Sequence, residues 1–510
     1  MRAFESQSNI NIIAKLSEPL KSGRFTSSPG QVITTFITLQ PEFAALLRSI
    51  DALEPFELIQ KCQSTLFDQS VNMHLVLRKQ ININASIEQV LVSLRKAYLQ
   101  YYCQQPTCVQ PEHLQTMVTI ACQSFNNEYL FYQTTEEEEL CGRLFAGNER
   151  AASDGLSFVS KVVAYAMYYP IYSLPLNERQ LQTLSQHGEY VQELIDRQIK
   201  ESALEANIAV DIPSFGRIDN EVSTKVRLQY EEAPYPRWVH LPSPEPRQFN
   251  TYIKKKFPFL DDVLETGTLQ CLCAGCGTGQ HALQMATKFA DSSVVAVDLS
   301  RRSLAYGMNQ ASRYGISNIE FVQGDLLQIK ALKRDFDLIE AVGVLHHMED
   351  PFSGLQALTD ELRPGGFMKI SVYRRSVRER LKPARERMRA RLGSFASPDL
   401  RSGRHELFIE KSMDFLMVFT DFYYLSGFRD LICNVQETSF APLEFKEPLQ
   451  KLNLSLLGVD YSDHPAVEAA FLKAYPGEDS SRNLDLCEEF EACNSELMPS
   501  LFKFWVRKIG

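Results

Sequence analysis

The feature that most constrains this chain of 510 residues is the segment 268–298. An apolar run leads into the turn GCGTG at 275–279, and an amphipathic stretch with helical spacing follows. A second apolar run then ends in Asp298. This order predicts a nucleoside-binding crossover, because glycines allow a tight turn, a helix start favours a negative group, and the acid can accept hydrogen bonds from ribose hydroxyls.

Further motifs follow in the order expected of a doubly wound sheet. Each closes or opens an apolar run of strand length, so the pattern alternates strands with helical stretches. In chain order these motifs are GDL at 324–326, FDLI at 336–339, GVLHH at 343–347 and RPGG at 363–366, which precedes a fifth run ending at residue 373.

The glycine pattern is Gly-x-Gly-x-Gly, and Gln280 stands where the nicotinamide fingerprint has its last glycine. This form, with an acid closing the next strand, resembles the nucleoside-binding loop of class I S-adenosylmethionine (AdoMet) methyltransferases. The resemblance implies an α/β fold with a seven-stranded Rossmann-like class I methyltransferase domain and S-adenosyl-L-methionine as cofactor. Residues 452–459 then resemble the sixth strand and 501–507 the antiparallel seventh.

A second resemblance is more specific. The segment YEEAPYPRW at 230–238, followed by AGCGTG and then GVLHH, is similar to a bacterial group of class I methyltransferases with a helical N-terminal region. Members are often fused to tetratricopeptide repeats, whereas this chain shows no repeat period. The resemblance covers most of the chain from about residue 40. The dipeptide Cys433-Asn434 stands where the group tends to have Phe-His.

The resemblance implies cofactor contacts at the carboxyl ends of the strands. The glycine turn would pass under the methionine and ribose of AdoMet, and the acid after the second strand would bind the ribose hydroxyls. The acid after the third strand would bind the adenine amino group, and the end of the fourth would face the methionine amino group. The cofactor-binding residues expected on this basis are Gly275, Cys276, Gly277, Gly279, Asp298, Leu299, Asp325, Leu326, Val342 and Gly343.

Four residues are candidates for catalysis. His346 and His347 follow the fourth strand, where either could take a proton from the acceptor or, alternatively, serve the local structure. Methyl transfer from a sulfonium needs mainly in-line positioning, so a dedicated base is not obligatory. Tyr235 and Arg237 lie in a proline-rich segment that we expect to close as a lid, with Arg237 holding a carboxylate; a rigid interdomain linker is the alternative.

A basic stretch and a group of cysteines can each be interpreted in two ways. The stretch 374–391 holds nine cationic and two acidic residues, which fit either an anionic acceptor site or a solvated helix face. The net charge of −10 argues against a nucleic-acid partner, although this stretch does not exclude one. Cys271, Cys273 and Cys276 suggest a metal, but their loop is already needed for the cofactor, so we expect none.

Length and composition predict two domains. A helical N-terminal domain is expected over 1–215, with a weakly ordered lead-in at 1–36, and the methyltransferase domain over 216–510. No apolar run is long enough for a membrane helix, and no signal-peptide core is recognisable. Eleven scattered cysteines do not form a disulfide framework, which favours a reducing cytoplasm.

The function predicted from these patterns is transfer of a methyl group from AdoMet to a small-molecule or macromolecular acceptor of unknown identity. One alternative is a binding protein that holds AdoMet without catalysis and uses its helical domain as an interaction surface. A second is a dinucleotide-dependent oxidoreductase, which Gln280 and the downstream motifs oppose.

Overall fold

A computed structural model describes residues 29–67, 73–104, 110–145, 155–242, 245–261, 263–264, 267–289, 291–392, 397–477 and 479–510. The lead-in expected at 1–36 falls partly outside this range, and its last residues belong instead to helix α2 (Pro29–Thr38). Among the described helices, none combines the length and apolar character needed to cross a membrane.

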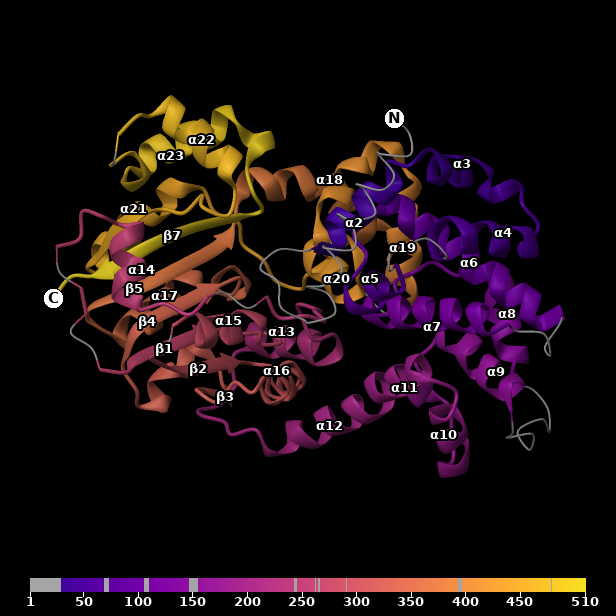
Figure 1. Cartoon of the computed structure of the whole chain (residues 1–510). Helices are drawn as coiled ribbons and strands as arrows, with labels where there is room; N and C mark the ends of the chain where they lie inside the picture. The colour runs from indigo at the N-terminus through magenta and orange to yellow at the C-terminus, as the bar shows by residue number, and fades with distance from the viewer. Residues whose placement is uncertain are drawn as a thin grey trace. The chain divides into compact units, whose positions relative to one another are not determined.

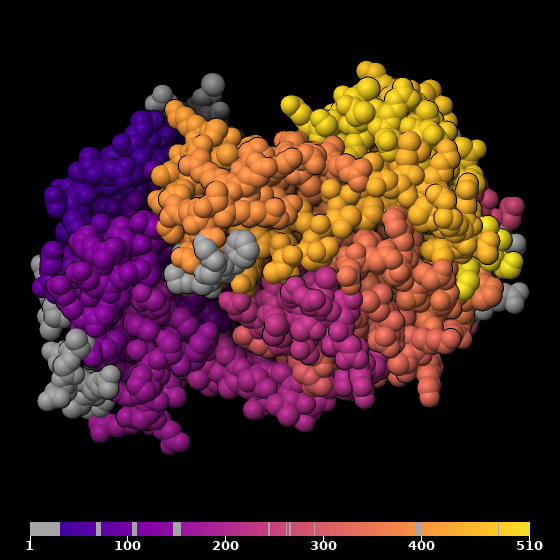
Figure 2. All heavy atoms as spheres, turned by 180° about the vertical axis from the view of Figure 1, so that it is seen from behind, coloured from indigo at the N-terminus to yellow at the C-terminus, as the bar shows by residue number. Residues whose placement is uncertain are grey.

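The chain divides into two compact units. The helical unit comprises Met1–Leu204, Arg237–Pro242 and Arg391–Leu431, and the sheet unit comprises Glu205–Pro236, Ser243–Ala390 and Ile432–Gly510. Figure 2 shows the late part of the helical unit, in orange, against its indigo and violet helices. The sequence indicated one boundary near residue 215 and gave no sign of this interleaving.

The helical unit is built from short helices around one apolar core. Proline at the first helical position starts several of them, and Thr134 with Glu137 forms a capping box at the start of another. The helices are α3 (Pro41–Ser49), α4 (Pro55–Cys62), α5 (Met73–Lys79), α6 (Ala85–Gln104), α7 (Pro111–Asn126), α8 (Thr135–Arg143), α9 (Leu156–Ala166), α10 (Glu178–Ser185), α11 (Glu189–Ile195) and α19 (Ser397–Ile409).

A buried ion pair fastens the late segment into this unit. The guanidinium of Arg404 on α19 donates to both carboxylate oxygens of Glu88 on α6. The same guanidinium lies over the rings of Phe408 and Phe422, at 4.6 and 4.5 Å from their centroids. Because an unpaired charge at this depth would be strongly destabilising, the pair fixes residues that are 316 positions apart in sequence.

The sheet unit contains a seven-stranded sheet in the order β3-β2-β1-β4-β5-β7-β6, which confirms the predicted fold class (Figure 1). The strands from β3 to β5 are parallel, and β7 is antiparallel to both β5 and β6. The strands are β1 (Leu269–Ala274), β2 (Ser292–Asp298), β3 (Ile319–Gln323), β4 (Phe336–Val342), β5 (Leu362–Tyr373), β6 (Leu454–Val459) and β7 (Leu501–Lys508).

Helices connect these strands and cover the sheet. Helix α15 follows the glycine turn, and the last helices of the chain lie in the insertion before β7, in yellow in Figure 1. The helices are α13 (Glu221–Glu232), α14 (Phe249–Lys256), α15 (Gln280–Lys288), α16 (Arg301–Tyr314), α17 (Pro351–Asp360), α21 (Lys446–Lys451), α22 (Pro465–Ala474) and α23 (Leu484–Cys493). In three further helices the chain crosses from one unit to the other. These are α12 (Glu201–Asp211), α18 (Arg375–Arg391) and α20 (Leu425–Cys433).

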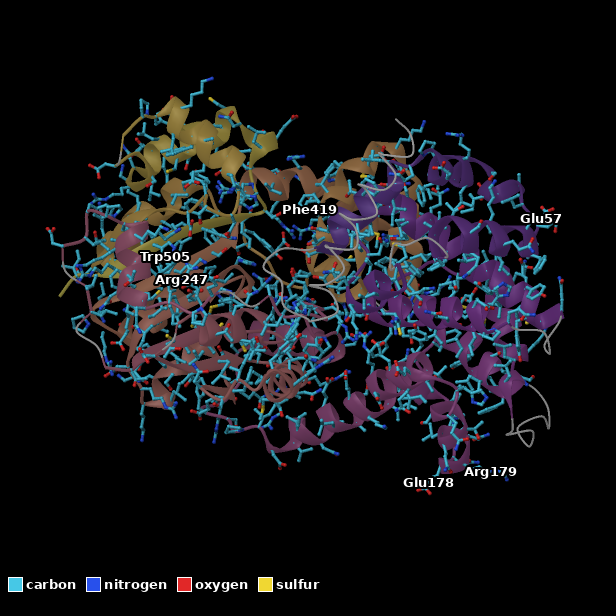
Figure 3. All side chains as sticks on the ribbon, viewed as in Figure 1. Glu57, Glu178, Arg179, Arg247, Phe419 and Trp505 are labelled. Atoms are coloured by element: carbon cyan, nitrogen blue, oxygen red, sulfur yellow. The ribbon has the colours of Figure 1, made fainter. Side chains whose placement is uncertain are left out.

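One row of side chains crosses the middle of the sheet on a single face. The strand register pairs Cys273 with Glu340, Glu340 with Lys369, and Lys369 with Trp505. Trp505, labelled in Figure 3, packs against Tyr252 of α14 with 6.2 Å between ring centroids. Of the two charged residues in this row, Glu340 is buried and Lys369 is half-buried, and Glu340 bears on the site described next.

Candidate active site

A cavity of about 250 Å³ lies in the sheet unit at the carboxyl ends of β1, β2, β3 and β4. This is where open parallel sheets bind their ligands. Every residue that the sequence assigned to cofactor binding lines the cavity except Gly279, which makes the turn behind it. The lining members are Gly275, Cys276, Gly277, Asp298, Leu299, Asp325, Leu326, Val342 and Gly343.

The glycine loop is shaped by its protein neighbours. Gly275 and Gly277 have φ angles of 66° and 53°, which residues other than glycine rarely adopt. A Cβ on Gly275 would overlap Val344, and one on Gly277 would overlap the carbonyl oxygen of Tyr235. Packing within the chain therefore already requires glycine at both positions.

The segment that was expected to act as a lid is fastened to this loop. Thr278 donates from its backbone N–H to Tyr235 O at 3.1 Å and from its hydroxyl to Pro236 O at 2.6 Å. Earlier in the segment, Glu231 accepts from the backbone N–H of Arg301, the first residue of α16, at 2.6 Å. Tyr235 and Pro236 consequently form part of the cavity wall.

Arg237 is not brought into the cavity wall. It belongs to the helical unit, where its guanidinium carbon lies 5.0 Å from the centroid of the Phe125 ring. The structure thus separates the two lid residues by role: Tyr235 lines the cavity and Arg237 makes a cation–π contact elsewhere. The expected carboxylate-holding role of Arg237 has no support in this arrangement.

Two carboxylates stand in the cavity wall. Asp298 accepts from the backbone N–H groups of Gly277 and Ser300, at 2.8 and 2.9 Å. Burial raises the pKa of Asp298 to about 6, although these hydrogen bonds lower it. Asp325 accepts from Leu327 N at 3.0 Å through Oδ1, and Oδ2 accepts no hydrogen bond within the described part of the chain. Both acids can therefore accept from a ligand.

The two histidines after β4 have different surroundings. His347 lines the cavity, and its Nδ1 lies 2.8 Å from the carbonyl oxygen of Gln436. Because a carbonyl can only accept, Nδ1 carries the hydrogen and Nε2 is the basic nitrogen of the neutral ring. This geometry suits a proton acceptor.

His346 is fully buried, lies outside the cavity wall, and packs on the Tyr373 ring with 3.7 Å between centroids. Its Nδ1 accepts from Tyr373 N at 3.3 Å. Burial, and the nearby His347 and Arg378, hold the pKa of His346 well below its usual value. His346 thus differs from His347, because its ring is buried outside the cavity wall and its lowered pKa favours the neutral form.

Sequence reasoning missed several residues of the wall, above all His281, Tyr230 and Met348. The Nε2 of His281, on α15, hydrogen-bonds Oε2 of Glu340, which is buried on β4. Burial raises the pKa of Glu340, but Lys369 and His281 outweigh this and lower it to about 2. An acid within the apolar run of β4 was the signal that could have found this pair.

The basic stretch after β5 is largely neutralised by the chain itself. Arg378 and Arg385 of α18 both pair with Glu437, and Arg378 also lies over the Tyr373 ring. Arg389 is exposed. This arrangement favours the structural interpretation for the inner face of α18. Further pairs are Arg374 with Glu491, Arg375 with Glu444, and Arg391 with Glu406.

The cysteines near the loop are buried thiols. Burial raises the pKa of Cys271, Cys273 and Cys276 well above the usual value, which disfavours the thiolate that a metal requires. No group of three or more histidine, cysteine or acidic side chains suited to a metal ion occurs among the residues that the structure describes.

The central segment of the chain is similar in sequence to known proteins. Residues 271–366 match the family model described as a methyltransferase domain. The chain is 31% identical over 175 residues to an uncharacterized protein of Synechococcus, covering 34% of this chain and 42% of that one. It is 34% identical over 103 residues to trans-aconitate 2-methyltransferase of Deinococcus radiodurans, covering 20% of this chain and 37% of that one.

Other matches follow the same segment. Identity is 28% over 146 residues with a ubiquinone biosynthesis O-methyltransferase of Paracidovorax citrulli, covering 28% of this chain and 59% of that one. The chain spans less than two thirds of the length of these curated relatives. Among solved structures, PKMT2 of Rickettsia typhi in complex with AdoHcy is 20% identical to this chain, with a TM-score of 0.40. The match covers 54% of this chain and 55% of that one. Residues 271–366 therefore belong to a methyltransferase domain.

Proposed function

We propose that this protein transfers a methyl group from AdoMet to an acceptor that binds beside His347. AdoMet supplies an electrophilic methyl group on a sulfonium centre. The observation that carries the proposal is that one cavity combines the glycine loop, Asp298, Asp325 and His347. A protein that only binds the cofactor has no need of a histidine whose tautomer is fixed at the cavity wall.

The cavity residues fit AdoMet. Asp298 stands at the end of β2, where it can accept from the ribose hydroxyls while two backbone N–H groups orient it. Asp325 has a carboxylate oxygen that can accept from the adenine amino group. Gly343 has open space where a side chain would project, so backbone at the end of β4 can approach a ligand closely. These are the positions that the motif resemblance assigned.

We propose an oxygen acceptor in particular. His347 is held through Nδ1, so its Nε2 can take the proton from a hydroxyl as the methyl group is transferred. Several of the curated relatives are by name O-methyltransferases, for ubiquinone biosynthesis or for malonyl-[acyl-carrier protein]. The acidic net charge disfavours nucleic acid as acceptor. Buried free thiols suit a reducing cytoplasm as the place of the reaction.

Calorimetry with S-adenosylhomocysteine and NAD tests the cofactor, and isotope-labelled AdoMet with a metabolite extract tests turnover. We expect S-adenosylhomocysteine to bind, NAD not to bind, and label to enter an extract component only with wild-type protein. The control is Asp298→Asn, which keeps the shape of the side chain and removes its charge. Binding of NAD alone would instead favour the oxidoreductase alternative. Cofactor binding with no label transfer would favour the non-catalytic one.

A further inference from the structure

We propose that Asn434 is a positioning residue for His347, and that it acts by fixing the backbone carbonyl that orients the His347 ring. The inference rests on the proposed function, because it concerns how the proton acceptor of that reaction is held. Asn434 belongs to the sheet unit, directly follows helix α20, and is 6% exposed. It lies outside the cavity wall, so it acts on the wall through its neighbours.

The side chain of Asn434 closes a tight turn beside His347. Its Oδ1 accepts from the backbone N–H of Gln436 at 3.2 Å. The carbonyl oxygen of the same residue, Gln436, lies 2.8 Å from His347 Nδ1. Asparagine favours such a turn because its side-chain oxygen can accept from the backbone two residues further on. Asn434 therefore helps to determine where the carbonyl that selects the His347 tautomer lies.

The amide nitrogen of Asn434 contacts a second residue of the cavity wall. Because a backbone N–H can only donate, the oxygen end of the amide faces Gln436 and the nitrogen end faces Tyr230. There Nδ2 donates to the Tyr230 hydroxyl oxygen at 3.2 Å. The Tyr230 ring meets the His347 ring edge to face, with 6.3 Å between the centroids and 71° between the planes. Asn434 thus connects two side chains of the wall that also pack on each other.

Other hydrogen bonds hold the segment on either side of Gln436. Before it, the Oε1 of Gln229 on α13 accepts from Val435 N at 3.0 Å. After it, Thr438 N donates to the carbonyl oxygen of His346 at 2.8 Å. These two bonds fix the flanks of the turn, and the asparagine side chain supplies the bond to Gln436 itself. A residue that served only to end α20 would need neither contact of its buried amide.

Nitrogen NMR on protein with isotope-labelled histidine tests this directly, since it reads the tautomer of His347 without cofactor or acceptor. The signals of His347 are assigned by their loss in His347→Gln. The variants compared are Asn434→Ala and Asn434→Ser, because serine restores an oxygen that can accept from the backbone and alanine does not. The matched control is Asn483→Ala. Asn483 accepts from Asp485 N at 3.0 Å in an equivalent turn of the sheet unit, outside this cavity.

Wild type, Asn434→Ser and the control should each show one neutral tautomer of His347, with the hydrogen on Nδ1. Asn434→Ala should show a mixture of both tautomers. It should also lower the transfer of label from AdoMet to extract components about tenfold or more, with affinity for S-adenosylhomocysteine within about twofold of wild type. Asn434→Ser should recover most of the lost transfer. Asn434→Leu fills the site without an acceptor and should behave as alanine does, which separates the lost bond from a cavity.

A single Nδ1–H tautomer in both Asn434→Ala and Asn434→Leu would overturn the inference and leave the proposed function intact. An equal loss of label transfer in the alanine and serine variants would do the same, because it would assign a purely structural role to the side chain. Wild-type protein that transfers no label would overturn the proposed function, and with it the catalytic role of this turn, whichever tautomer His347 adopts.

Discussion

The hydroxyl of Thr278 donates a 2.6 Å hydrogen bond to the carbonyl oxygen of Pro236, which lines the cavity. The wall formed by Tyr235 and Pro236 is thereby tied to the glycine loop. Thr278→Val removes the hydroxyl at nearly constant shape, so we expect unfolding free energy to fall by about 1 kcal/mol and affinity for S-adenosylhomocysteine to fall several-fold. Thr278→Ser keeps the hydroxyl and should resemble wild type in melting and calorimetry.

Asp298 predicts a dependence of cofactor affinity on pH. We expect Asp298→Asn to weaken S-adenosylhomocysteine by about 1.5–3 kcal/mol at pH 8, because a charged acceptor is replaced by a neutral one. Since the pKa of Asp298 is raised to about 6, wild-type affinity should rise from pH 5 to pH 7 through this group. Calorimetry across that range checks this, and a variant with the same slope as wild type would assign the slope to another group.

The same pKa has the opposite effect on folding. Between the unfolded value of 3.8 and about 6, folded Asp298 binds more protons than unfolded Asp298. Its contribution to stability is therefore greatest at low pH and decreases as pH rises to about 6, above which it is constant. Urea unfolding of wild type and Asp298→Asn at pH 4.5 and 7 should show the wild type losing relative stability at the higher pH.

His347 and His346 should separate catalysis from stability. His347→Gln is expected to lower the turnover of an oxygen acceptor about 10²–10⁴-fold and to leave S-adenosylhomocysteine affinity unchanged. His346→Gln should act on stability, because its buried ring packs on Tyr373. The depressed pKa of His346 means that the unfolded chain binds more protons below about pH 6.5, so wild-type stability falls as pH decreases there.

Paired measurements of turnover and melting on the two variants check this division. The component of acid destabilisation that belongs to His346 should be missing from His346→Gln. A His346 variant with wild-type stability but no turnover would reverse the two roles.

We expect Glu437 to stabilise the fold, because its loss would leave two buried arginines without their counter-ion. Its carboxylate serves Arg378 and Arg385 together, and both partners lie largely buried on α18. Glu437→Ala is expected to lower unfolding free energy by about 3–5 kcal/mol, since it leaves buried charges unpaired. Arg389→Ala, on the exposed side of the same helix, should stay within about 0.5 kcal/mol. Equal, small effects in urea unfolding would show that the pairing contributes little.

The sequence predicted the sheet well because its signals are local. Apolar runs gave β1 to β5, and the turn with its positive-φ glycines marked where the ligand cavity opens. Asp298 and Asp325 could be placed because one ends β2 and the other follows β3 by two residues, and strand ends in a parallel sheet meet at one edge. Position in the chain was sufficient for these residues.

The remainder depends on contacts between distant segments, which no local pattern encodes. That Arg378 pairs with Glu437, 59 positions away, could not be read from the run of cations. Which of the two rings, His346 or His347, is covered depends on such contacts, and so does the position of Arg237 outside the cavity wall that its neighbours Tyr235 and Pro236 reach.

The interleaving of the two units has a consequence for how the chain emerges during synthesis. The helical unit needs residues up to Leu431, because Arg404 there completes the pair with Glu88. The sheet unit needs β7, whose last residue is Lys508, because that strand lies between β5 and β6. Neither unit can be finished until the ribosome has passed these late segments, so the nascent chain must keep both sets of apolar surfaces from aggregating until the segments have emerged.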